Sequence, residues 1–407
     1  MDPVIPSTPI RSATPGPVEL TPVALHRVAP DPRADWLREL PGEGWEALAE
    51  RLGLPAYRGR QIRHWALGLS VRTFKEMTDL PRTLRERLDE ETRIGGPILA
   101  EEAGSDGVRK ILYGLDDGEG AEAVSLPHPY GRSVCISSQV GCKMACAFCA
   151  SGLLGFGRNL SAAEIVGQVV ALSALAPEDR VRRVVFMGMG EPLDNLAAVV
   201  WAIRFLTDSQ GFGLSQRHVT LSTSGLVPRV ENFMKEGLKV RLAISLHSAV
   251  DEVRRSLMPV ARAYDLSALA DVARRYTLFS GHRVTYEYAL IRDVNDTPQA
   301  LEALKAFLRK APGHVNLIPL NHVPETGLLR SRPERRLAFQ DGLLSAGFSA
   351  TFRRELGGEI DAACGQLRRR ALGGRVGASG LFGDHDRHAG RPTSRAERGL
   401  GPVRTPA

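Results

Sequence analysis

The chain has 407 residues, 43% of them hydrophobic and 24% charged, which is the composition of a globular protein with room for one large domain and a smaller one. No run of about 18 apolar residues occurs, and the N-terminus lacks the charged and apolar regions of a secretory signal, so the sequence predicts a cytoplasmic protein without a membrane helix. Residues 368–407 hold nine arginines against three acidic residues and so carry +6 of the net charge of +7. The rest of the chain is therefore close to neutral, and a basic surface on it has to be inferred from local clusters of residues, because the net charge does not indicate one.

The N-terminal third divides by composition into three segments. Residues 1–32 hold eight prolines and no apolar periodicity, which predicts disorder. Residues 33–95 show helical periodicity and predict a small helical domain, whereas residues 96–131 predict short strands and turns. The periodic pieces are 45–54, 59–68 and 82–91 for helices, and 110–115 and 122–127 for strands.

One helical piece mixes basic and aromatic residues between Tyr57 and Trp65, as helices that contact RNA often do. Its candidate RNA contacts are Arg58, Arg60 and Arg63. By composition alone, a solvated amphipathic helix is the more frequent explanation of such a pattern.

From residue 132 to about 371, strands and helices alternate. A capping box of Ser161 and Glu164 begins one helix, and Thr297 before Pro298 begins another. The alternation predicts a parallel sheet covered by helices, open or closed into a barrel, with its active site at the carboxyl ends of the strands. Residues 372–407 predict a disordered basic tail. The strands are expected at 133–139, 182–188, 217–223, 240–246, 283–291, 314–320 and 348–354.

Three of the five cysteines, Cys142, Cys146 and Cys149, follow the first of these strands at spacing C-x3-C-x2-C. An odd, clustered set favours metal or redox chemistry over a disulfide framework. A structural zinc site wants four ligands, usually with a second cysteine pair, and the sequence has no second pair. A [4Fe–4S] cluster takes one thiolate per iron, so three cysteines would leave one iron open to a substrate. The spacing therefore predicts such a cluster, which Phe148 would help to shield from water.

Several strand ends carry polar groups or glycines. In "VVFMGMGEP", residues 184–192, Gly188 and Gly190 allow a ligand to approach the backbone, and Glu191 offers a carboxylate. Each such end is more often a turn or a cap, but together they converge on one barrel mouth, where they could hold a single ligand. The further residues of this set are Ser222, Ser245, Leu246, His247 and Asn321.

The cysteine spacing resembles the signature of the radical S-adenosylmethionine (SAM) superfamily, and the glycine–glutamate element resembles the one that contacts SAM there. Residues 135–165, 213–228, 244–248, 315–321 and 360–367 further resemble the RlmN/Cfr family of RNA adenine methyltransferases, and the likeness extends from about Trp36 to Leu367. It implies a partial (β/α)6 barrel and a helical accessory domain that contacts RNA. It also implies one [4Fe–4S] cluster with SAM on the open iron, and two SAM molecules per turnover.

The resemblance assigns roles to the two remaining cysteines and to one glutamate. It implies that Cys364 takes a methyl group from one SAM, and that a radical from a second SAM activates this group for addition to the electron-poor carbon 2 of adenine. Cys135 would release the product through a transient disulfide with Cys364. Glu122, in "AEAVSLP", is the implied proton acceptor. Ala123 and Glu359 stand where the family usually has Thr and Asp.

The implied substrates are adenosine 2503 of 23S rRNA and adenosine 37 of some tRNAs, bases that must leave the stack to react. The implied electron donor is a reductase system such as flavodoxin. One alternative is methylation at carbon 8, the Cfr activity. Another is a non-enzymatic iron–sulfur electron carrier or redox sensor, which would have no use for Cys135, Cys364 or the SAM-site residues.

Overall fold

The computed structural model describes residues 33–40, 44–153, 155–321, 323, 326–353 and 360. The predicted disordered head, the basic tail, Glu359 and Cys364 lie outside this part of the chain. Within it, no helix combines the length and the apolar composition needed to cross a membrane.

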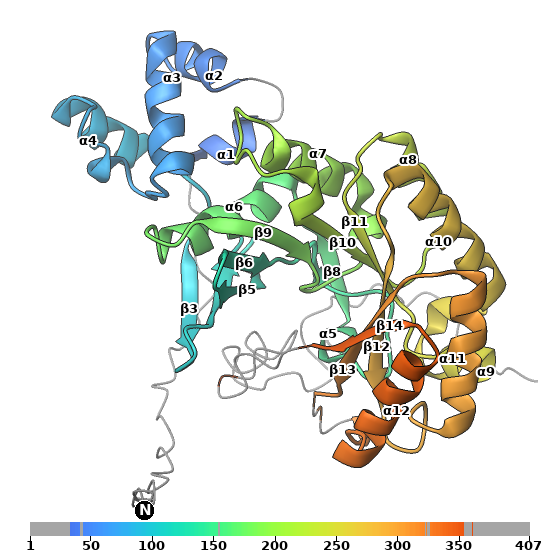
Figure 1. Ribbon diagram of the computed structural model, residues 1–407. Coiled ribbons are helices and arrows are strands. Elements are labelled where there is room, and N and C mark those ends of the chain that lie inside the picture. The colour runs from blue at the N-terminus through green and yellow to red at the C-terminus, as the bar shows by residue number, and fades with distance from the viewer. Residues whose placement is uncertain are drawn as a thin grey trace, which may run out of the picture. The chain divides into compact units, whose positions relative to one another are not determined.

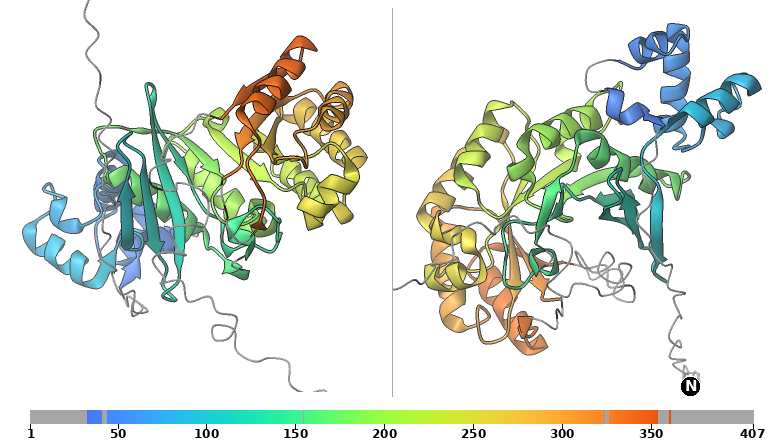
Figure 2. Two further views of the ribbon diagram at one scale, coloured as in Figure 1. Left: turned by 90° about the horizontal axis from the view of Figure 1, so that it is seen from below. Right: turned by 180° about the vertical axis from the view of Figure 1, so that it is seen from behind.

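A ten-stranded sheet organises the described residues in the order β14-β13-β12-β11-β10-β9-β6-β5-β4-β3 (Figure 1). The strands from β6 through β9 to β14 are parallel, and β5, β4 and β3 extend the sheet beyond them as an antiparallel part (Figure 2). The strands are β3 (Ile98–Ala103), β4 (Arg109–Gly114), β5 (Gly120–His128), β6 (Gly131–Cys135), β9 (Val181–Phe186), β10 (Val219–Thr223), β11 (Arg241–Ser245), β12 (Thr285–Leu290), β13 (His314–Pro319) and β14 (Ser349–Phe352). This arrangement confirms the predicted α/β class, and β14, at the strand expected over 348–354, is a seventh parallel strand beside the six of a (β/α)6 barrel.

Helices connect the parallel strands and follow one another around their outer side (Figure 1). Both predicted caps are present: the Ser161 hydroxyl accepts a hydrogen bond from the Glu164 amide, and the Thr297 side chain accepts one from the Ala300 amide, each at 3.2 Å. The helices are α6 (Ala162–Ala174), α7 (Leu196–Thr207), α8 (Val227–Lys235), α9 (Asp251–Leu257), α10 (Leu266–Ser280), α11 (Pro298–Lys310) and α12 (Pro333–Ser345), with 3₁₀ turns η4 (Pro192–Asn195), η5 (Gln216–His218) and η6 (Pro259–Arg262).

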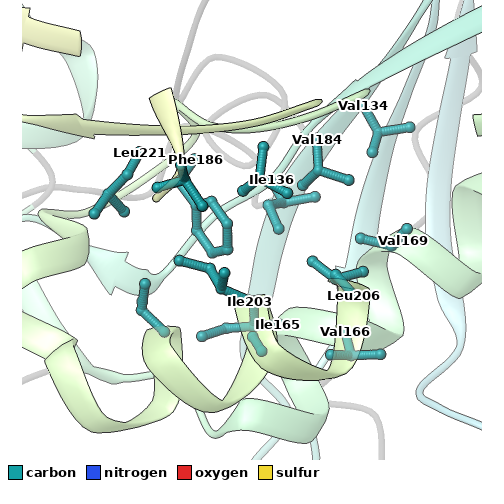
Figure 3. Packing of buried hydrophobic residues seen from close by; sticks show 14 of the residues in the cluster. Val134, Ile136, Ile165, Val166, Val169, Val184, Phe186, Ile203, Leu206 and Leu221 are labelled. Atoms are coloured by element: carbon teal, nitrogen blue, oxygen red, sulfur yellow. The ribbon is translucent and has the colours of Figure 1, made fainter. Parts of the chain in front are cut away.

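The main core lies between the sheet and these helices. Its side chains are mostly β-branched or leucine, and burial of each contributes about 1.5–3 kcal/mol to folding. Figure 3 shows Val134, Ile136, Val184, Phe186 and Leu221 of the sheet side facing Ile165, Val166 and Val169 of α6 and Ile203 and Leu206 of α7.

The N-terminal helices pack against the barrel rather than standing apart. Trp36 and Leu37 are buried in the same apolar cluster as α6, and the Arg63 guanidinium donates to the Ser209 carbonyl at 3.2 Å. The predicted piece 59–68 continues past α3 as a π-helix, because the Leu69 amide bonds to the His64 carbonyl five residues back. The elements are β1 (Ala34–Asp35), α1 (Trp36–Glu39), α2 (Trp45–Arg51), α3 (Ala56–Arg63), η2 (His64–Gly68), η3 (Phe74–Glu76), α4 (Arg82–Glu91) and β2 (Thr92–Arg93).

Candidate active site

The three clustered cysteines lie between the strands of a small hairpin, β7 (Gln139–Gly141) and β8 (Phe156–Asn159), with the short helix α5 (Ala150–Leu153). The Cys142 amide donates to the Gly155 carbonyl at 2.8 Å. Gly141 has φ +72°, and a Cβ there would collide with the same carbonyl. Further along, the Ala147 amide donates to the Leu257 carbonyl at 2.9 Å. Backbone contacts therefore hold the cysteine loop to β8 and to α9.

The cysteine thiols are half-buried and influence one another. Burial raises the pKa of Cys142 to about 11 and also raises that of Cys146, and a neighbouring thiol adds to each rise. Thiolates packed so closely need a cation to stabilise their charge, and iron provides one. In the described part of the chain no three Cys, His, Asp or Glu side chains form a group able to hold one metal ion. A [4Fe–4S] cluster instead takes its three thiolates at three separate irons, so the residues fit a cluster.

An apolar group covers the cysteine loop. Phe148 and Cys146 pack against Leu257, Met258, Ala289, Ile291 and Leu320. The Phe148 ring meets the His247 ring edge-on, with 4.5 Å between centroids. These side chains exclude water from one side of the loop.

The glycine–glutamate element after β9 packs against the start of the cysteine hairpin. Gly190 has φ +100°, and a Cβ there would collide with Gln139. The Gln139 side-chain oxygen accepts from the Glu191 amide at 2.9 Å. The Glu191 carboxylate is 3% exposed and accepts from the amides of Leu193 at 3.1 Å and Ser224 at 2.7 Å. Burial raises the pKa of Glu191, so an incoming ammonium group would stabilise its charged form.

A fully buried arginine joins the ends of two neighbouring strands. The Arg254 guanidinium, on α9, donates to the carbonyls of Ser224 after β10 and of Ser245 and Leu246 at the end of β11, at 2.9, 3.5 and 3.3 Å, and to that of Tyr264 at 3.3 Å. Burial lowers its pKa to about 10, so it stays charged at neutral pH. Because the Ser224 amide in turn bonds to Glu191, Arg254 fixes the wall of the candidate SAM site.

We expect Arg254→Lys to lower the free energy of unfolding by about 2–4 kcal/mol, because an ammonium cannot span these carbonyls and leaves buried acceptors unpaired. Arg255→Lys is the matched control: Arg255 neighbours Arg254 on α9, its side chain is 43% exposed, and it pairs with Asp251 and Glu252. The control should change stability by no more than about 0.5 kcal/mol. Urea unfolding followed by circular dichroism measures both, and equal values would remove Arg254 from this role.

His247 adopts a left-handed backbone with φ +53° and is 5% exposed. Its Nδ1 accepts from the Ala289 amide at 3.0 Å, and the Asn295 amide group donates to its carbonyl at 2.6 Å. Burial, helped by Arg254, lowers the pKa of His247 to about 3, so the ring is neutral. Since Nδ1 is the acceptor, Nε2 carries the hydrogen and is a donor.

The structure places the other predicted SAM contacts at the carboxyl edge of the sheet. Ser222 in β10 and Ser245 at the end of β11 are half-buried, and Leu246 is fully buried. Asn321, after β13, is exposed. Their contacts with SAM remain predictions.

The two predicted catalytic residues that the structure describes, Glu122 and Cys135, share one face of the sheet. Cys135 of β6 pairs directly with Val124 of β5, two residues from Glu122, and Val124 pairs with Lys110 of β4. Lys110 Nζ lies 4.0 Å from Glu122 Oε1, with the two side chains 1% and 4% exposed. The local sequence gave no sign of this pairing between β4 and β5. The pairing brings Lys110 next to Glu122 and so makes Lys110 a further residue of the candidate site.

The chain returns to this face after β14. Burial raises the pKa of the Cys135 thiol, and the Arg353 guanidinium opposes the rise. Because Arg353 follows β14 and Cys135 ends β6, this interaction means that the sheet curls to bring them near. Ile360 packs with Cys135, Val108 and Val124.

The predicted RNA-contacting arginines use part of their hydrogen-bonding capacity within the chain. Arg58 donates to the Gln61 side chain at 2.7 Å, and Arg60 lies 3.6 Å from Glu46. Arg60 is exposed, and Arg58 and Arg63 are half-buried. RNA contact by these side chains stays a prediction.

Two family models match the chain. One is described as the radical SAM superfamily and matches residues 136–304. The other is described as the ribosomal RNA large subunit methyltransferase N-terminal domain and matches residues 37–94.

Curated relatives and a solved structure cover most of the chain. A "Probable dual-specificity RNA methyltransferase RlmN" of Symbiobacterium thermophilum is 45% identical over 341 residues, 82% of this chain and 91% of the relative. A protein of the same description from Geobacillus thermodenitrificans is 43% identical, over 78% of this chain and 88% of its own length. The crystal structure of a radical SAM methyltransferase from Sphaerobacter thermophilus is 40% identical, with a TM-score of 0.76 over 82% of this chain and 98% of that one.

Proposed function

Because this chain belongs to the RlmN family of radical SAM RNA methyltransferases, we propose that it methylates carbon 2 of adenosine 2503 in 23S rRNA and carbon 2 of adenosine 37 in tRNAs. The family membership sets aside the non-enzymatic electron carrier. The relatives are described as dual-specificity RNA methyltransferases, which supports two RNA substrates, and as RlmN, to which the family resemblance assigns carbon 2 rather than the carbon 8 of Cfr.

In this proposal Cys142, Cys146 and Cys149 hold the [4Fe–4S] cluster. When bound there, the cluster would supply the single electron for the reductive cleavage of SAM to a 5′-deoxyadenosyl radical. Glu191 receives the SAM amino group and Gly190 lets it approach. Ser222, Ser245, Leu246, His247 and Asn321 complete the SAM site.

The observation that carries the mechanism is the shared position of Glu122, Cys135 and Ile360 on one face of the sheet. Ile360 precedes Cys364, the proposed methyl carrier, by four residues in the sequence. Cys364 first takes a methyl group from one SAM, which leaves as S-adenosylhomocysteine. The 5′-deoxyadenosyl radical from a second SAM would remove one hydrogen from this methyl group, and the resulting S-bound carbon radical adds to carbon 2 of the adenine ring. The adduct would then lose one electron, for which the oxidised cluster would be the acceptor. Glu122 takes the ring proton, and the nearby Lys110 keeps the Glu122 carboxylate in the charged form that can accept it. Cys135 then attacks the Cys364 sulfur, which breaks the bond between that sulfur and the RNA-bound carbon. A disulfide between Cys135 and Cys364 forms, and the released carbon takes up a proton to become the methyl group of the product.

The remaining partners follow from this chemistry. The cluster needs one-electron reduction, for which we propose a reductase system such as flavodoxin. A further reductant reopens the disulfide after each turnover, and both reactions suit the cytoplasm. The N-terminal arginines Arg58, Arg60 and Arg63 would contact the RNA.

The test is to map methylated nucleosides in rRNA and tRNA from cells with and without this gene. We expect 2-methyladenosine at both positions to disappear with the gene and to return on complementation. Appearance of 8-methyladenosine instead would establish the carbon 8 alternative.

Peptide mass spectrometry of anaerobically purified protein should show a methyl group on Cys364, and a constantly unmodified Cys364 beside an intact cluster would contradict the mechanism.

A further inference from the structure

A group of arginines surrounds the start of α12. Arg330, Arg332, Arg335 and Arg336 occur within seven residues, with Glu334 among them, and Arg353 joins them from the end of β14. We call these five side chains the arginine rim; all are exposed except Arg336, which is half-buried. Burial and the nearby Arg336 lower the pKa of Arg330, so like charges have been brought together here. Such repulsion is tolerated where an anionic partner relieves it.

The carboxylates on the neighbouring β12–α11 loop offset only part of this charge. Asp296 is 3% exposed and accepts hydrogen bonds from the Ser331 hydroxyl and the Asp293 amide. Asp293 is exposed, but Arg292 of the same loop offsets it and donates to the Arg330 carbonyl at 3.2 Å. The rim and this loop together hold six arginines against Asp293, Asp296 and Glu334.

The arginine rim lies on the same edge of the sheet as the catalytic residues. Since α12 follows β13, its first turn is at the carboxyl edge of the parallel strands. Arg353 reaches from this edge to the neighbourhood of Cys135, whose thiol pKa it affects, and of the buried Glu287. The Nε of Arg336 is buried and makes no hydrogen bond within the described residues. Arg353 therefore links the rim to the side of the sheet that carries Cys135.

An apolar hollow of about 310 Å³ lies within the rim. Its volume is at the lower end of the range for small-molecule sites. Leu337, on one side of the hollow, is 57% exposed, although a polar residue at this position would not weaken the core. The lining residues are Pro319, Pro333, Arg336, Leu337, Phe352 and Arg353.

We propose that this hollow binds a nucleotide that flanks the reacting adenine in the RNA substrate. The flanking base packs on Leu337, Phe352 and Pro319, and the phosphates beside it accept hydrogen bonds from Arg332, Arg335 and Arg336. Unstacked RNA bases are recognised in this way, by apolar or aromatic surfaces with arginines at the backbone. Holding the neighbour would keep the target adenine out of the stack. The inference rests on the proposed RNA substrate and adds the surface that recognises it.

The test measures RNA affinity of the full-length, cluster-loaded protein by fluorescence anisotropy. The probe is a labelled RNA hairpin containing adenosine 2503 and its neighbours, titrated at several salt concentrations. We expect Arg336→Gln to weaken binding about tenfold and Arg335→Gln/Arg336→Gln about a hundredfold, with the salt slope falling by about 1 per lost phosphate contact. Leu337→Ser should weaken binding without changing the salt slope, because it removes an apolar contact.

Arg309→Gln is the matched control. Arg309 is an exposed arginine in the last turn of α11, which leads into β13 and so lies at the opposite, amino edge of the sheet. The RNA affinity of the Arg309→Gln variant should equal that of the wild type. Unchanged affinity in the rim variants overturns the inference, and so does an equal loss in Arg309→Gln. A drop in melting temperature of Arg336→Gln without loss of RNA affinity would show that the hollow holds the chain's own following segment, which also overturns it. If the wild type binds but never methylates the hairpin, the proposed function fails while the binding comparison still decides the inference.

Discussion

Cys135→Ala should stop the enzyme after each chain has formed one covalent adduct with RNA through Cys364. Cys135 is 7% exposed and belongs to a small apolar cluster with Val108 and Val124, apart from the cysteine loop. Its loss should therefore leave cluster assembly and SAM cleavage intact. Without an attacking thiol, the bond between the Cys364 sulfur and the RNA-bound carbon cannot be exchanged for a disulfide. Methylation therefore ends with an adduct that approaches one equivalent.

Radiolabelled RNA that runs with the protein on a denaturing gel measures this adduct. Cys142→Ala is the comparison, because it removes a proposed cluster ligand and should give neither adduct nor cleavage of SAM. Iron content and the visible absorption of the cluster show which step each variant has lost. Repeated turnover by Cys135→Ala, with free methylated RNA and no adduct, would remove Cys135 from product release.

The sequence was sufficient for the parts of the fold that depend on local pattern. Each expected strand of the barrel overlaps one observed strand, and the helices after Ser161 and Thr297 begin where their caps stand. The polar ends of β10 and β11 could be placed at the mouth for the same reason, since strand direction alone fixes which end faces it.

Features that depend on contacts distant in the sequence were missed. Arg254 and Arg255 are adjacent and chemically identical, yet one is fully buried among carbonyls and the other is 43% exposed. The β7–β8 hairpin was also missed, because its strands are three and four residues long and include glycines, arginine and asparagine, which carry little strand signal. β3 was missed as well, since its two consecutive glutamates break the apolar alternation.

Lys110 is the clearest case of a site residue without a sequence signal. In "VRKILYGL" it looks like the polar start of a strand. Its burial follows only from the pairing of β4 with β5, which sets it opposite Val124 and diagonal to Glu122. A buried lysine beside a buried carboxylate stabilises the charged form of that carboxylate.

Glu122→Gln should lower the methylation rate about 10²- to 10⁴-fold, the usual contribution of a general base, while leaving SAM cleavage active. Glutamine has the shape of glutamate and can still face Lys110, but it cannot accept the ring proton, so the adduct stays at the stage before rearomatisation. Production of 5′-deoxyadenosine should therefore exceed methylated RNA by a large factor, whereas the wild type couples the two. Glu101→Gln, on the edge strand β3 that pairs with β4, removes a carboxylate that is 35% exposed and pairs with Arg109 at 3.2 Å, and it should keep the wild-type ratio.

Lys110→Met tests whether Lys110 acts on the reaction through Glu122 or independently of it. If Lys110 keeps Glu122 charged, its removal should reduce methylation and leave SAM cleavage active, as Glu122→Gln does, and the double variant should be no slower than Glu122→Gln alone, because both changes act on one group. The melting temperature must be measured beside the rates, since breaking a buried pair can cost about 3–5 kcal/mol. Additive rate losses in a folded double variant would mean that Lys110 acts on the reaction independently of Glu122.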